Sequence, residues 1–416
     1  MSTPEILYLI AKCLGLLLGL CYVYQVIYLF LPLFFKKSVP DTADLRRYAI
    51  LIAARNEEAV LPHLLDSIRN QDYPPELIRV FVVADNCTDR TAQVAQQGGA
   101  VVFSRFSTNR VGKGYALNYL LEQIDISCGW EDFDAFLVFD ADNILCPDYI
   151  TQINKVCAAG YGVFCGYRNS KNFGTNWVSA GHSLWFLHDS IHLNASRMAL
   201  GNPCTVTGTG FGFTRKIAQT YGGWNFFTLT EDIEFSFRCI TDGVKMGYCH
   251  DAVLYDEQPE TFRQSWRQRT RWVQGGVQVS VRYAKALLKG IFRGGRRSWA
   301  CLEAATLSLW GYSAGVLCGG LSLVAATLAA GWNGMGHTLL MALLSAYGFS
   351  FLMGAMTLLM AHKRIRATTA QKLLALFAFP MYTLTYAPIG ATALFRKFHW
   401  PPIEHKVAVS AQELTQ

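Results

Sequence analysis

Two aspartates in the stretch FLVFDADN have the spacing of a metal–phosphate site. Asp140 and Asp142 follow an apolar run and have one residue between them. Two carboxylates this close repel each other unless a cation offsets their charge. Mg²⁺ and Mn²⁺ prefer oxygen ligands and bridge the phosphates of a substrate. The pair therefore favours a divalent-metal site for a phosphorylated substrate, and the alternative is a solvated acidic turn.

A second acidic pair lies at the predicted start of a helix. Glu231 and Asp232 come directly before apolar residues at helical spacing, so they would occupy the first helical turn. Thr228 and Glu231 fit a capping box, in which two side chains satisfy backbone groups at the helix start. At most one of the two acids can take part in the cap. A carboxylate fixed beside a metal–phosphate site can act as a general base. We therefore predict catalytic roles for this pair.

Two glycine-rich stretches could approach a phosphate or a sugar closely. Lys113 stands between two glycines before a predicted helix, and such a lysine suits a phosphate. The stretch 207–215, TGTGFGFTR, has glycines that allow another molecule to approach the backbone. Neither stretch has the spacing of a P-loop or of a dinucleotide-binding turn. The sequence thus argues against those two motifs and keeps both stretches as candidate substrate contacts.

Cations gather in residues 262–300, which contain ten Lys or Arg and no Asp or Glu. Apolar residues recur there every three to four positions, a pattern typical of an amphipathic helix on an anionic membrane surface. We assign Arg263, Arg267 and Arg282 to that membrane face, and we expect Gly275-Gly276 to weaken or bend the helix. Arg269 has no predicted role.

Strands and helices that alternate along the chain would position these residues. Apolar runs predict strands at 46–54, 78–85, 100–106 and 134–140. Helical spacing predicts helices at 59–71, 89–97 and 113–124. Such alternation is typical of a parallel sheet with helices on both faces, whose ligands bind beyond the carboxyl ends of the strands. The polar residues at those ends are Arg55, Asn56, Glu57, Asp85, Asn86, Asp140 and Asp142.

Long apolar segments flank the α/β region. Hydrophobic residues make up 51% of the chain and charged residues only 16%, which is less than soluble domains usually have. Residues 5–35, 301–330 and 337–361 are each long enough to cross a bilayer. Residues 372–395 are also apolar but contain two prolines, so we expect an in-plane or re-entrant helix there.

Positive charge next to these segments orients the chain. Under the positive-inside rule, residues 36–300 and 362 onward lie in the cytosol. Twelve cysteines without C-x-x-C spacing fit reduced thiols in that compartment. The predicted parts are a transmembrane helix at 1–37, a cytosolic domain at 38–260, basic interface helices at 261–297, two transmembrane helices at 298–362, and a membrane-associated or re-entrant segment with a cytosolic tail at 363–416.

The order of the motifs resembles a known signature. Asp85, the pair Asp140/Asp142, TED ending at Asp232, and QRTRW at 268–272 occur in the order found in membrane-embedded family 2 glycosyltransferases. That group includes cellulose, hyaluronan, chitin and poly-N-acetylglucosamine synthases. The resemblance covers residues 46–290. It implies a GT-A domain, the α/β fold of nucleotide-diphospho-sugar transferases, inserted between transmembrane helices.

The resemblance also implies a role for each matching residue. Ala53, Arg55, Asn56, Glu57 and Asp85 would hold the nucleotide base and ribose. Lys113, Asp140, Gln268 and Arg271 would face the diphosphate. Asp140 and Asp142 would ligate Mg²⁺ or Mn²⁺. Asp232, next to Glu231, would deprotonate the acceptor hydroxyl. Gly208, Thr209, Gly210 and Trp272 would line the acceptor site.

The leading hypothesis is an inverting, processive β-glycosyltransferase that extends a polysaccharide from UDP-glucose or UDP-N-acetylglucosamine at the cytosolic face of the plasma membrane. A lipid glycosyltransferase resembling ceramide or diacylglycerol glucosyltransferases is the alternative. Three membrane spans would form only a narrow channel for a polymer. A homo-oligomer or an accessory export subunit could therefore complete the export path. A basic nucleic-acid-binding or scaffold protein is a third hypothesis, but strands buried on both faces argue against it. The expected partners are the UDP-sugar, a growing glycan or lipid, and membrane lipids, but no nucleic acid.

Overall fold

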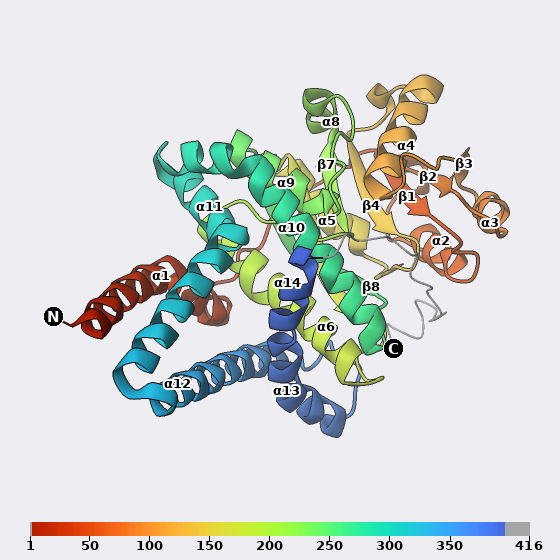
Figure 1. The fold of residues 1–416 in the computed structure, drawn as a ribbon. Helices are drawn as coiled ribbons and strands as arrows, with labels where there is room; N and C mark the ends of the chain where they lie inside the picture. Colours follow the sequence, from red (N-terminus) through yellow and green to blue (C-terminus); the bar gives the residue numbers. More distant parts are fainter. Residues whose placement is uncertain (1, 396–416) are drawn as a thin grey trace.

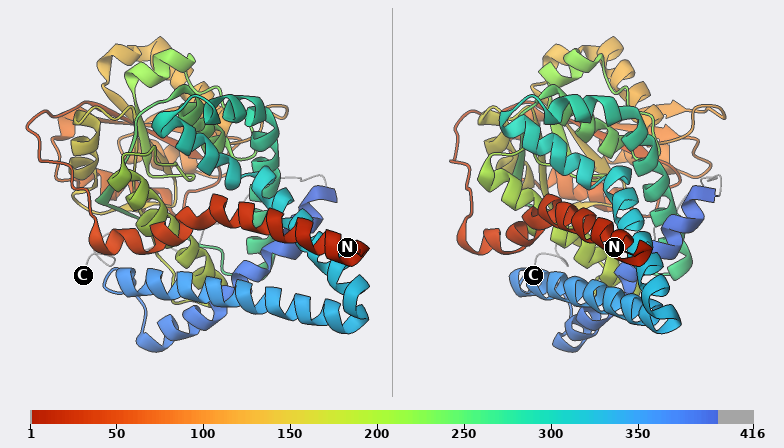
Figure 2. Two further views of the ribbon diagram at one scale, coloured as in Figure 1. Left: turned by 90° about the vertical axis from the view of Figure 1, so that its left-hand side faces the viewer. Right: turned by 60° about the vertical axis from the view of Figure 1, so that its left-hand side comes forward.

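The computed structural model describes residues 2–395 of the 416-residue chain (Figure 1). An α/β domain occupies the middle of the chain, and helices from both ends of the chain pack beside it. Figure 2 shows the N-terminal helix α1 (Thr3–Phe34) beside α12 (Leu309–Ala361). The candidate residues belong to the α/β domain and to the helix that follows it.

One eight-stranded sheet forms the centre of the domain, in the order β3-β2-β1-β4-β7-β6-β8-β5. Its strands are β1 (Tyr48–Ala54), β2 (Ile78–Asp85), β3 (Val101–Arg105), β4 (Ala135–Asp140), β5 (Ile144–Leu145), β6 (Val163–Ser170), β7 (Phe211–Thr214) and β8 (Met246–Asp256). The first four strands are parallel, as predicted. β7 runs antiparallel to β4 and β6, and β5 runs antiparallel to β8. The prediction of a parallel sheet therefore holds for β1–β4, and β6 also pairs in parallel with β8, but the sheet as a whole is mixed.

Helices pack against the sheet through apolar faces. Those that follow β1 are α2 (Leu61–Arg69), α3 (Thr91–Gln97), α4 (Lys113–Cys128), α5 (Tyr149–Ala158), α6 (Trp177–His188), α7 (Ala195–Leu200), α8 (Arg215–Tyr221) and α9 (Glu231–Asp242). Two short 3₁₀-helices, at Pro75–Leu77 and Trp130–Asp132, and a π-helix at Asp189–Asn194 complete the domain. α4 packs on β1 and β2 with Leu117 and Leu121 buried, and α5 packs on β6 and β8 with Ile150 and Ile153 buried. This burial accounts for the unbroken apolar runs of the strands.

Helix α10 (Phe262–Ile291) continues without a break through Gly275 and Gly276, so the expected bend is wrong. A Cβ atom at Gly275 would lie 2.5 Å from Thr230 Oγ1 and 2.8 Å from the Thr230 backbone nitrogen. The missing side chain thus lets α10 pack directly against the N-terminus of α9. This tertiary contact outweighs the helix-weakening effect of glycine, which is about 1 kcal/mol.

The apolar helix predicted over residues 301–330 begins eight residues later. Residues 301–306 belong to a separate helix, α11 (Gly295–Thr306), and the apolar helix α12 starts at Leu309. Glu303 explains the difference, because its buried carboxylate pairs with Arg197 of the domain at 2.6 Å. α11 therefore packs against the α/β domain.

Three helices in residues 2–395 are long and apolar enough to cross a membrane: Thr3–Phe34, Leu309–Ala361 and Thr369–Ala393. α12 changes direction at Ala330 and Gly331, whose backbone angles are not helical, so it contains the predicted segment 337–361 and the part of the segment 301–330 from Leu309 onward. The segment expected to be in-plane or re-entrant forms α13 (Thr369–Leu384) and α14 (Tyr386–Phe395), with Pro380 inside α13. The expected tail at 396–416 lies outside the described residues. All twelve cysteines are free thiols, as predicted.

Candidate active site

The carboxyl ends of three neighbouring strands bring the predicted donor-binding residues to one edge of the sheet. Ala53 of β1 pairs in register with Asp140 of β4, and Ala54 pairs with Ala84 of β2, one residue before Asp85. Parallel strands place such ends side by side. The structure therefore groups Asp85 and Asp140 as the sequence predicted.

Asp85 is an ion-paired carboxylate, which the sequence did not indicate. Its Oδ1 accepts a hydrogen bond from Nη1 of Arg105, and both side chains are buried. Arg105 ends the neighbouring strand β3, opposite Asp85 in register. A buried carboxylate held by such a partner presents a fixed acceptor at the strand edge.

The loops that follow β1 and β2 are held by two asparagines in left-handed backbone conformation. Asn56 has φ 57° and Asn86 has φ 55°, values that asparagine tolerates better than most residues. Asn56 Oδ1 accepts a hydrogen bond from the Thr88 backbone at 2.8 Å, and Asn86 Oδ1 accepts one from the Ser107 backbone at 2.9 Å. The amide oxygens thus bind neighbouring loops. Beside them, the Arg55 Nε is buried without a hydrogen-bond partner in the described part of the chain.

Three predicted motifs meet at the end of β4. Lys113 Nζ donates to Asp140 Oδ1 and, at 2.7 Å, to the Gly208 carbonyl. The Asp140 backbone donates to Thr209 Oγ1 at 2.9 Å. Gly210 has φ 64°, and a Cβ atom there would lie 1.9 Å from the Leu254 side chain. The glycine-lysine turn, the aspartate pair and the 208–210 loop therefore form one structural unit.

Asp142 lies on the other side of the same turn, in acidic surroundings that the sequence analysis missed. Its buried carboxylate accepts the Glu257 backbone N–H at 3.2 Å. Burial raises the pKa of the neighbouring Asp256, while the guanidinium of Arg168 opposes that shift and Asp142 adds to it. Asp256 ends strand β8, so the rule of polar residues at strand ends would have found it.

A divalent metal fits these residues only if the substrate supplies further ligands. No group of three or more His, Cys, Asp or Glu side chains able to hold a metal occurs within residues 2–395. Mg²⁺ commonly takes one or two protein carboxylates and completes its shell with water and substrate phosphates. Asp140, whose side chain is one-third exposed, and Asp142 match that pattern. They would hold a metal together with a bound diphosphate.

The second acidic pair occupies the first turn of α9, as predicted. Burial raises the pKa of Glu231 to about 7, the charge of Asp232 adds to the shift, and Lys113 and Arg271 oppose it. Burial also raises the pKa of Asp232, against hydrogen bonds from the backbone and the charges of the same two cations. Glu231, Asp232, Lys113 and Arg271 therefore form one cluster, although they are far apart in the sequence.

The predicted capping box does not form at the start of α9. The residue before α9 is Thr230, and its side chain makes no capping hydrogen bond, so the predicted Thr228–Glu231 capping box is wrong. Glu234 instead holds the loop before the helix, because its Oε2 accepts the backbone N–H groups of Phe227 and Thr228 at 3.0 Å each. Glu231 therefore has no role in a capping box.

Glu234 also pairs with a residue that the sequence assigned to the membrane face. Its Oε1 lies 2.7 Å from Nη1 of Arg282 on α10. Arg282 therefore joins α10 to α9 by an ion pair, whereas the basic helical pattern had placed it on a lipid surface. The sequence could not show this contact because its two partners are 48 residues apart.

The motif QRTRW lies on α10, beside the start of α9. The Gln268 Oε1 is buried and has no hydrogen-bond partner among the described residues. Trp272 is partly buried, with edge-on contacts to His182 at 5.5 Å and Phe186 at 5.6 Å between ring centroids. Part of its indole surface thus packs on α6 and the remainder is accessible.

Arg269, which had no predicted role, is fully buried. Its Nη1 donates to the Tyr382 carbonyl at 3.0 Å and to Thr385 Oγ1 at 2.8 Å. Its guanidinium carbon lies 4.3 Å from the centroid of the Tyr382 ring and 4.9 Å from that of Tyr386. Alternate positions of the motif therefore face opposite ways, with Arg271 toward the acids and Arg269 toward the apolar helices α13 and α14.

A mixed α/β sheet with carboxylates at the ends of its central strands, and a helix N-terminus that presents two more, defines a GT-A glycosyltransferase domain. The family model "Glycosyltransferase like family 2" matches residues 46–275, more than half of the chain. The chain belongs to this family.

Two curated relatives show how different the products of similar chains can be. The chain is 30% identical over 266 residues to a beta-monoglucosyldiacylglycerol synthase of Nostoc sp., covering 61% of this chain and 54% of that one. It is 25% identical over 252 residues to a poly-beta-1,6-N-acetyl-D-glucosamine synthase of Staphylococcus aureus, covering 59% and 58%. The matched region thus spans little more than half of these relatives.

A solved structure supports the fold. A mannosyltransferase from Pyrobaculum calidifontis, in complex with GDP-Man and Mn²⁺, superposes with a TM-score of 0.58 at 19% identity. The match covers 92% of this chain and 99% of that chain. Such a likeness establishes a shared GT-A architecture.

Proposed function

We propose that this chain transfers a sugar from a UDP-sugar to an acceptor hydroxyl with inversion, and that repeated transfer extends a polysaccharide. The observation that carries the proposal is the cluster of Glu231, Asp232, Lys113 and Arg271, with acids and cations from three separate motifs. Acids in that cluster can accept a proton, and the cations can stabilise a leaving diphosphate.

In the proposed reaction Asp232 accepts the proton of the acceptor hydroxyl. The acceptor oxygen then forms a bond to the anomeric carbon, while the bond from that carbon to the diphosphate oxygen breaks and leaves its electron pair on the diphosphate. Burial raises the pKa of Glu231 to about 7, so below that pH it is mostly protonated, which favours Asp232 as the ionised base. A single displacement converts an α-linked donor into a β-linked product.

Lys113 and Arg271 would offset the charge that develops on the UDP. Asp140 and Asp142 would hold Mg²⁺ or Mn²⁺, which lowers the barrier by neutralising charge on the diphosphate oxygens. The unpaired Gln268 Oε1 would accept a hydrogen bond from the sugar, because a buried acceptor without a partner is costly. The accessible part of Trp272 would offer an apolar face to the acceptor ring.

A lipid acceptor is the second candidate function. The 30% identity to a glucosyldiacylglycerol synthase favours it, and apolar helices next to α10 would give a lipid access to Trp272. In both cases we propose a plasma-membrane protein with a cytosolic catalytic domain. Export of a polymer would require a second copy of the chain or an accessory subunit, because few helices are available.

Product analysis tests the proposal. The full-length chain is incubated with UDP-glucose or UDP-N-acetylglucosamine, Mn²⁺ and bilayer lipids, and the products are separated by size and by mass spectrometry. A ladder of oligosaccharides supports polymer extension, and a lipid carrying one sugar supports the second candidate. Release of UDP without any glycosidic product would contradict both.

A further inference from the structure

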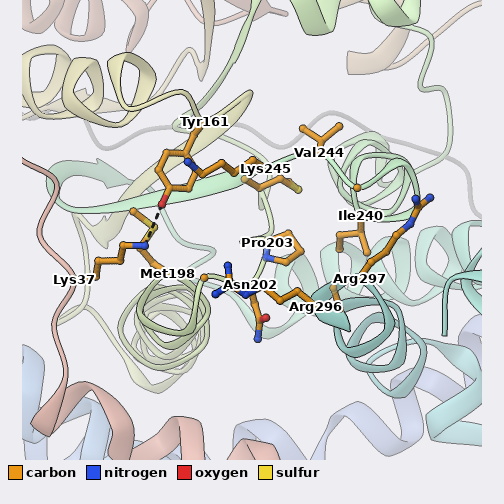
Figure 3. A pocket seen from close by; sticks show the side chains of 14 residues that line it. Lys37, Tyr161, Met198, Asn202, Pro203, Ile240, Val244, Lys245, Arg296 and Arg297 are labelled. Atoms are coloured by element: carbon orange, nitrogen blue, oxygen red, sulfur yellow. Dashed lines mark hydrogen bonds between the residues drawn. The ribbon is translucent and has the colours of Figure 1, made fainter. Parts of the chain in front are cut away.

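A second cationic region lies apart from the acids, in a cavity of about 400 Å³ between the α/β domain and the start of α11 (Figure 3). Among the described residues that line it, four are cationic and none is acidic. The cations are Lys37, Lys245, Arg296 and Arg297. No residue of the candidate active site lines this cavity, so it is not the donor site.

No carboxylate of residues 2–395 forms an ion pair with these four side chains. Lys37 Nζ donates to the Tyr161 hydroxyl at 3.4 Å, and Lys245 Nζ lies 4.2 Å from the centroid of the same ring. Among the described residues, the side chains of Arg296 and Arg297 make no hydrogen bond, and the Arg297 Nε is buried without a partner. A buried polar atom of this kind is expected to have a partner in the functional state.

Nearby groups supply only partial negative charge. Asp242, next to the cavity in sequence, is engaged by Arg238 at 2.7 Å. The guanidinium groups of Arg296 and Arg297 lie beside Gly201 and Gly243, which follow the last residues of α7 and α9. Each helix end contributes about half a negative charge. The cavity therefore remains cationic and suits an anion with several oxygen atoms.

The cavity lies where apolar helices meet the α/β domain. Lys37 is three residues beyond the end of α1, and α11 is fixed to α1 by an edge-on contact of Trp299 with Tyr24 at 5.6 Å. Phe34 and Phe35, just before Lys37, are 76% and 62% exposed. Phe292, just before the arginines, is 82% exposed. Exposed apolar rings close in sequence to the cationic lining match a position where hydrocarbon gives way to anionic lipid headgroups.

We propose that this cavity binds the phosphate-bearing headgroup of an anionic membrane lipid, held chiefly by Arg296 and Arg297. Lys37 and Lys245 add charge from the opposite wall. Charge-assisted contacts to phosphate are among the strongest hydrogen bonds of arginine. Inorganic phosphate or a free nucleotide offers the same anion, but neither explains the three exposed phenylalanines.

Lipid retention by the full-length chain tests the proposal. The detergent-solubilised chain is titrated with dioleoylphosphatidylglycerol or dioleoylphosphatidylcholine, and bound lipid is counted by native mass spectrometry. We expect one phosphatidylglycerol to be retained in preference to phosphatidylcholine. The double variant Arg296→Gln/Arg297→Gln should weaken that binding by about tenfold or more, because each basic residue near a lipid surface contributes substantially.

The matched control is Lys289→Gln/Arg293→Gln, which removes the same charge just outside the cavity. It should weaken binding by no more than about threefold. Equal losses in the two double variants, or no preference for phosphatidylglycerol, would overturn the proposal, and so would displacement of the lipid by millimolar inorganic phosphate or UDP. If the arginine variant fails to fold, Lys37→Gln/Lys245→Gln makes the same comparison with two exposed side chains.

Discussion

Strands β1–β4 and strands β5–β8 are assembled differently. In the first group each strand follows the last after a single helix or short loop, and all four are parallel. In the second group the partners come from distant segments: β7 lies between β4 and β6, and β8 lies between β6 and β5. The proposed donor residues belong mainly to the first group. The proposed base lies on α9, between β7 and β8, and the QRTRW motif lies on α10, after β8.

The two groups of strands show two ways of positioning site residues. Some residues are positioned by elements that follow one another in the chain, and others by packing between segments far apart in the sequence. Lys113 and Asp140 meet because the start of α4 lies at the same edge of the sheet as the end of β4, the strand that follows α4. Asp232 and Arg271 meet because α10 packs on the start of α9, at Gly275 and Thr230. α10 is in turn held to α13 by Arg269. The geometry of the proposed base therefore depends on the apolar helices, whereas that of the donor residues at the ends of β1, β2 and β4 does not.

The largest effect on turnover is expected from a substitution of Asp232. It tests whether the proposed base lies among the residues positioned by long-range packing. Asp232→Asn should reduce turnover by about 10³-fold or more, because an amide cannot accept the acceptor proton. UDP binding, measured by calorimetry, should stay near that of the unmodified chain. Asp242→Asn at the far end of the same helix is the control and should keep most activity. A variant Asp232→Asn with most of its turnover would show that another group is the base.

The next effect compares two adjacent glycines of α10. Gly275→Ala should move the start of α9, because its Cβ would lie 2.5 Å from Thr230 Oγ1, and we expect turnover to fall by about 10²-fold. Gly276→Ala is the matched control, since a Cβ there has nothing within 4 Å. It should leave turnover unchanged and stabilise the helix by about 1 kcal/mol. Equal turnover in the two variants would mean that close packing of α10 on α9 does not position the base.

The sequence predicted the first group of strands well because each signal is local. The strand at 78–85 and the start of the helix at Lys113 agree with β2 and α4 to the residue. The second group was not predicted, because antiparallel pairing of β7 with β4 joins segments more than 70 residues apart. Hydrophobic runs do not encode the direction of such a partner.

The residues of the candidate site also divide into those that the sequence indicated and those that it did not. Residue types and motif order indicated Asp140, Asp142, Asp232 and Arg271, and the structure brings these motifs together, while their roles stay predictions. The sequence did not indicate Arg105 beside Asp85, or Glu234 as the group that holds the loop before α9. Both act through partners that alternation and spacing cannot identify. The same holds for Arg282, which is exposed, as its basic surroundings predict, but pairs with Glu234 of another helix.

A smaller effect is expected at the contact between α10 and the apolar helices. Arg269→Met keeps most of the side-chain volume but loses the hydrogen bonds to Tyr382 and Thr385, so it should destabilise the chain by about 2 kcal/mol. Thermal unfolding in detergent measures this change. Arg267→Met, at an exposed position on the same helix, should have little effect. If both variants unfold at the same temperature, Arg269 does not link the two parts, and the dependence of the proposed base on the apolar helices loses its support.

The smallest effect concerns the proton on Glu231. In the folded chain its pKa is about 7, compared with 4.5 for an ordinary glutamate, so between those pH values the folded chain holds a proton that the unfolded chain releases. Stability from this group is present below pH 4.5 and is lost as pH rises through 7. Glu231→Gln cannot ionise, so its unfolding temperature relative to the unmodified chain should rise between pH 5 and pH 8.

The same ionisation bears on donor binding, because an ionised Glu231 competes with the diphosphate for Lys113 and Arg271. The KM for the UDP-sugar should therefore rise by about threefold from pH 6 to pH 8 in the unmodified chain and stay level in Glu231→Gln. A parallel rise in both would assign the pH dependence to another group. A level KM in both would mean that ionisation of Glu231 does not weaken the contacts of Lys113 and Arg271 with the donor. Donor binding would then be independent of the acids on α9.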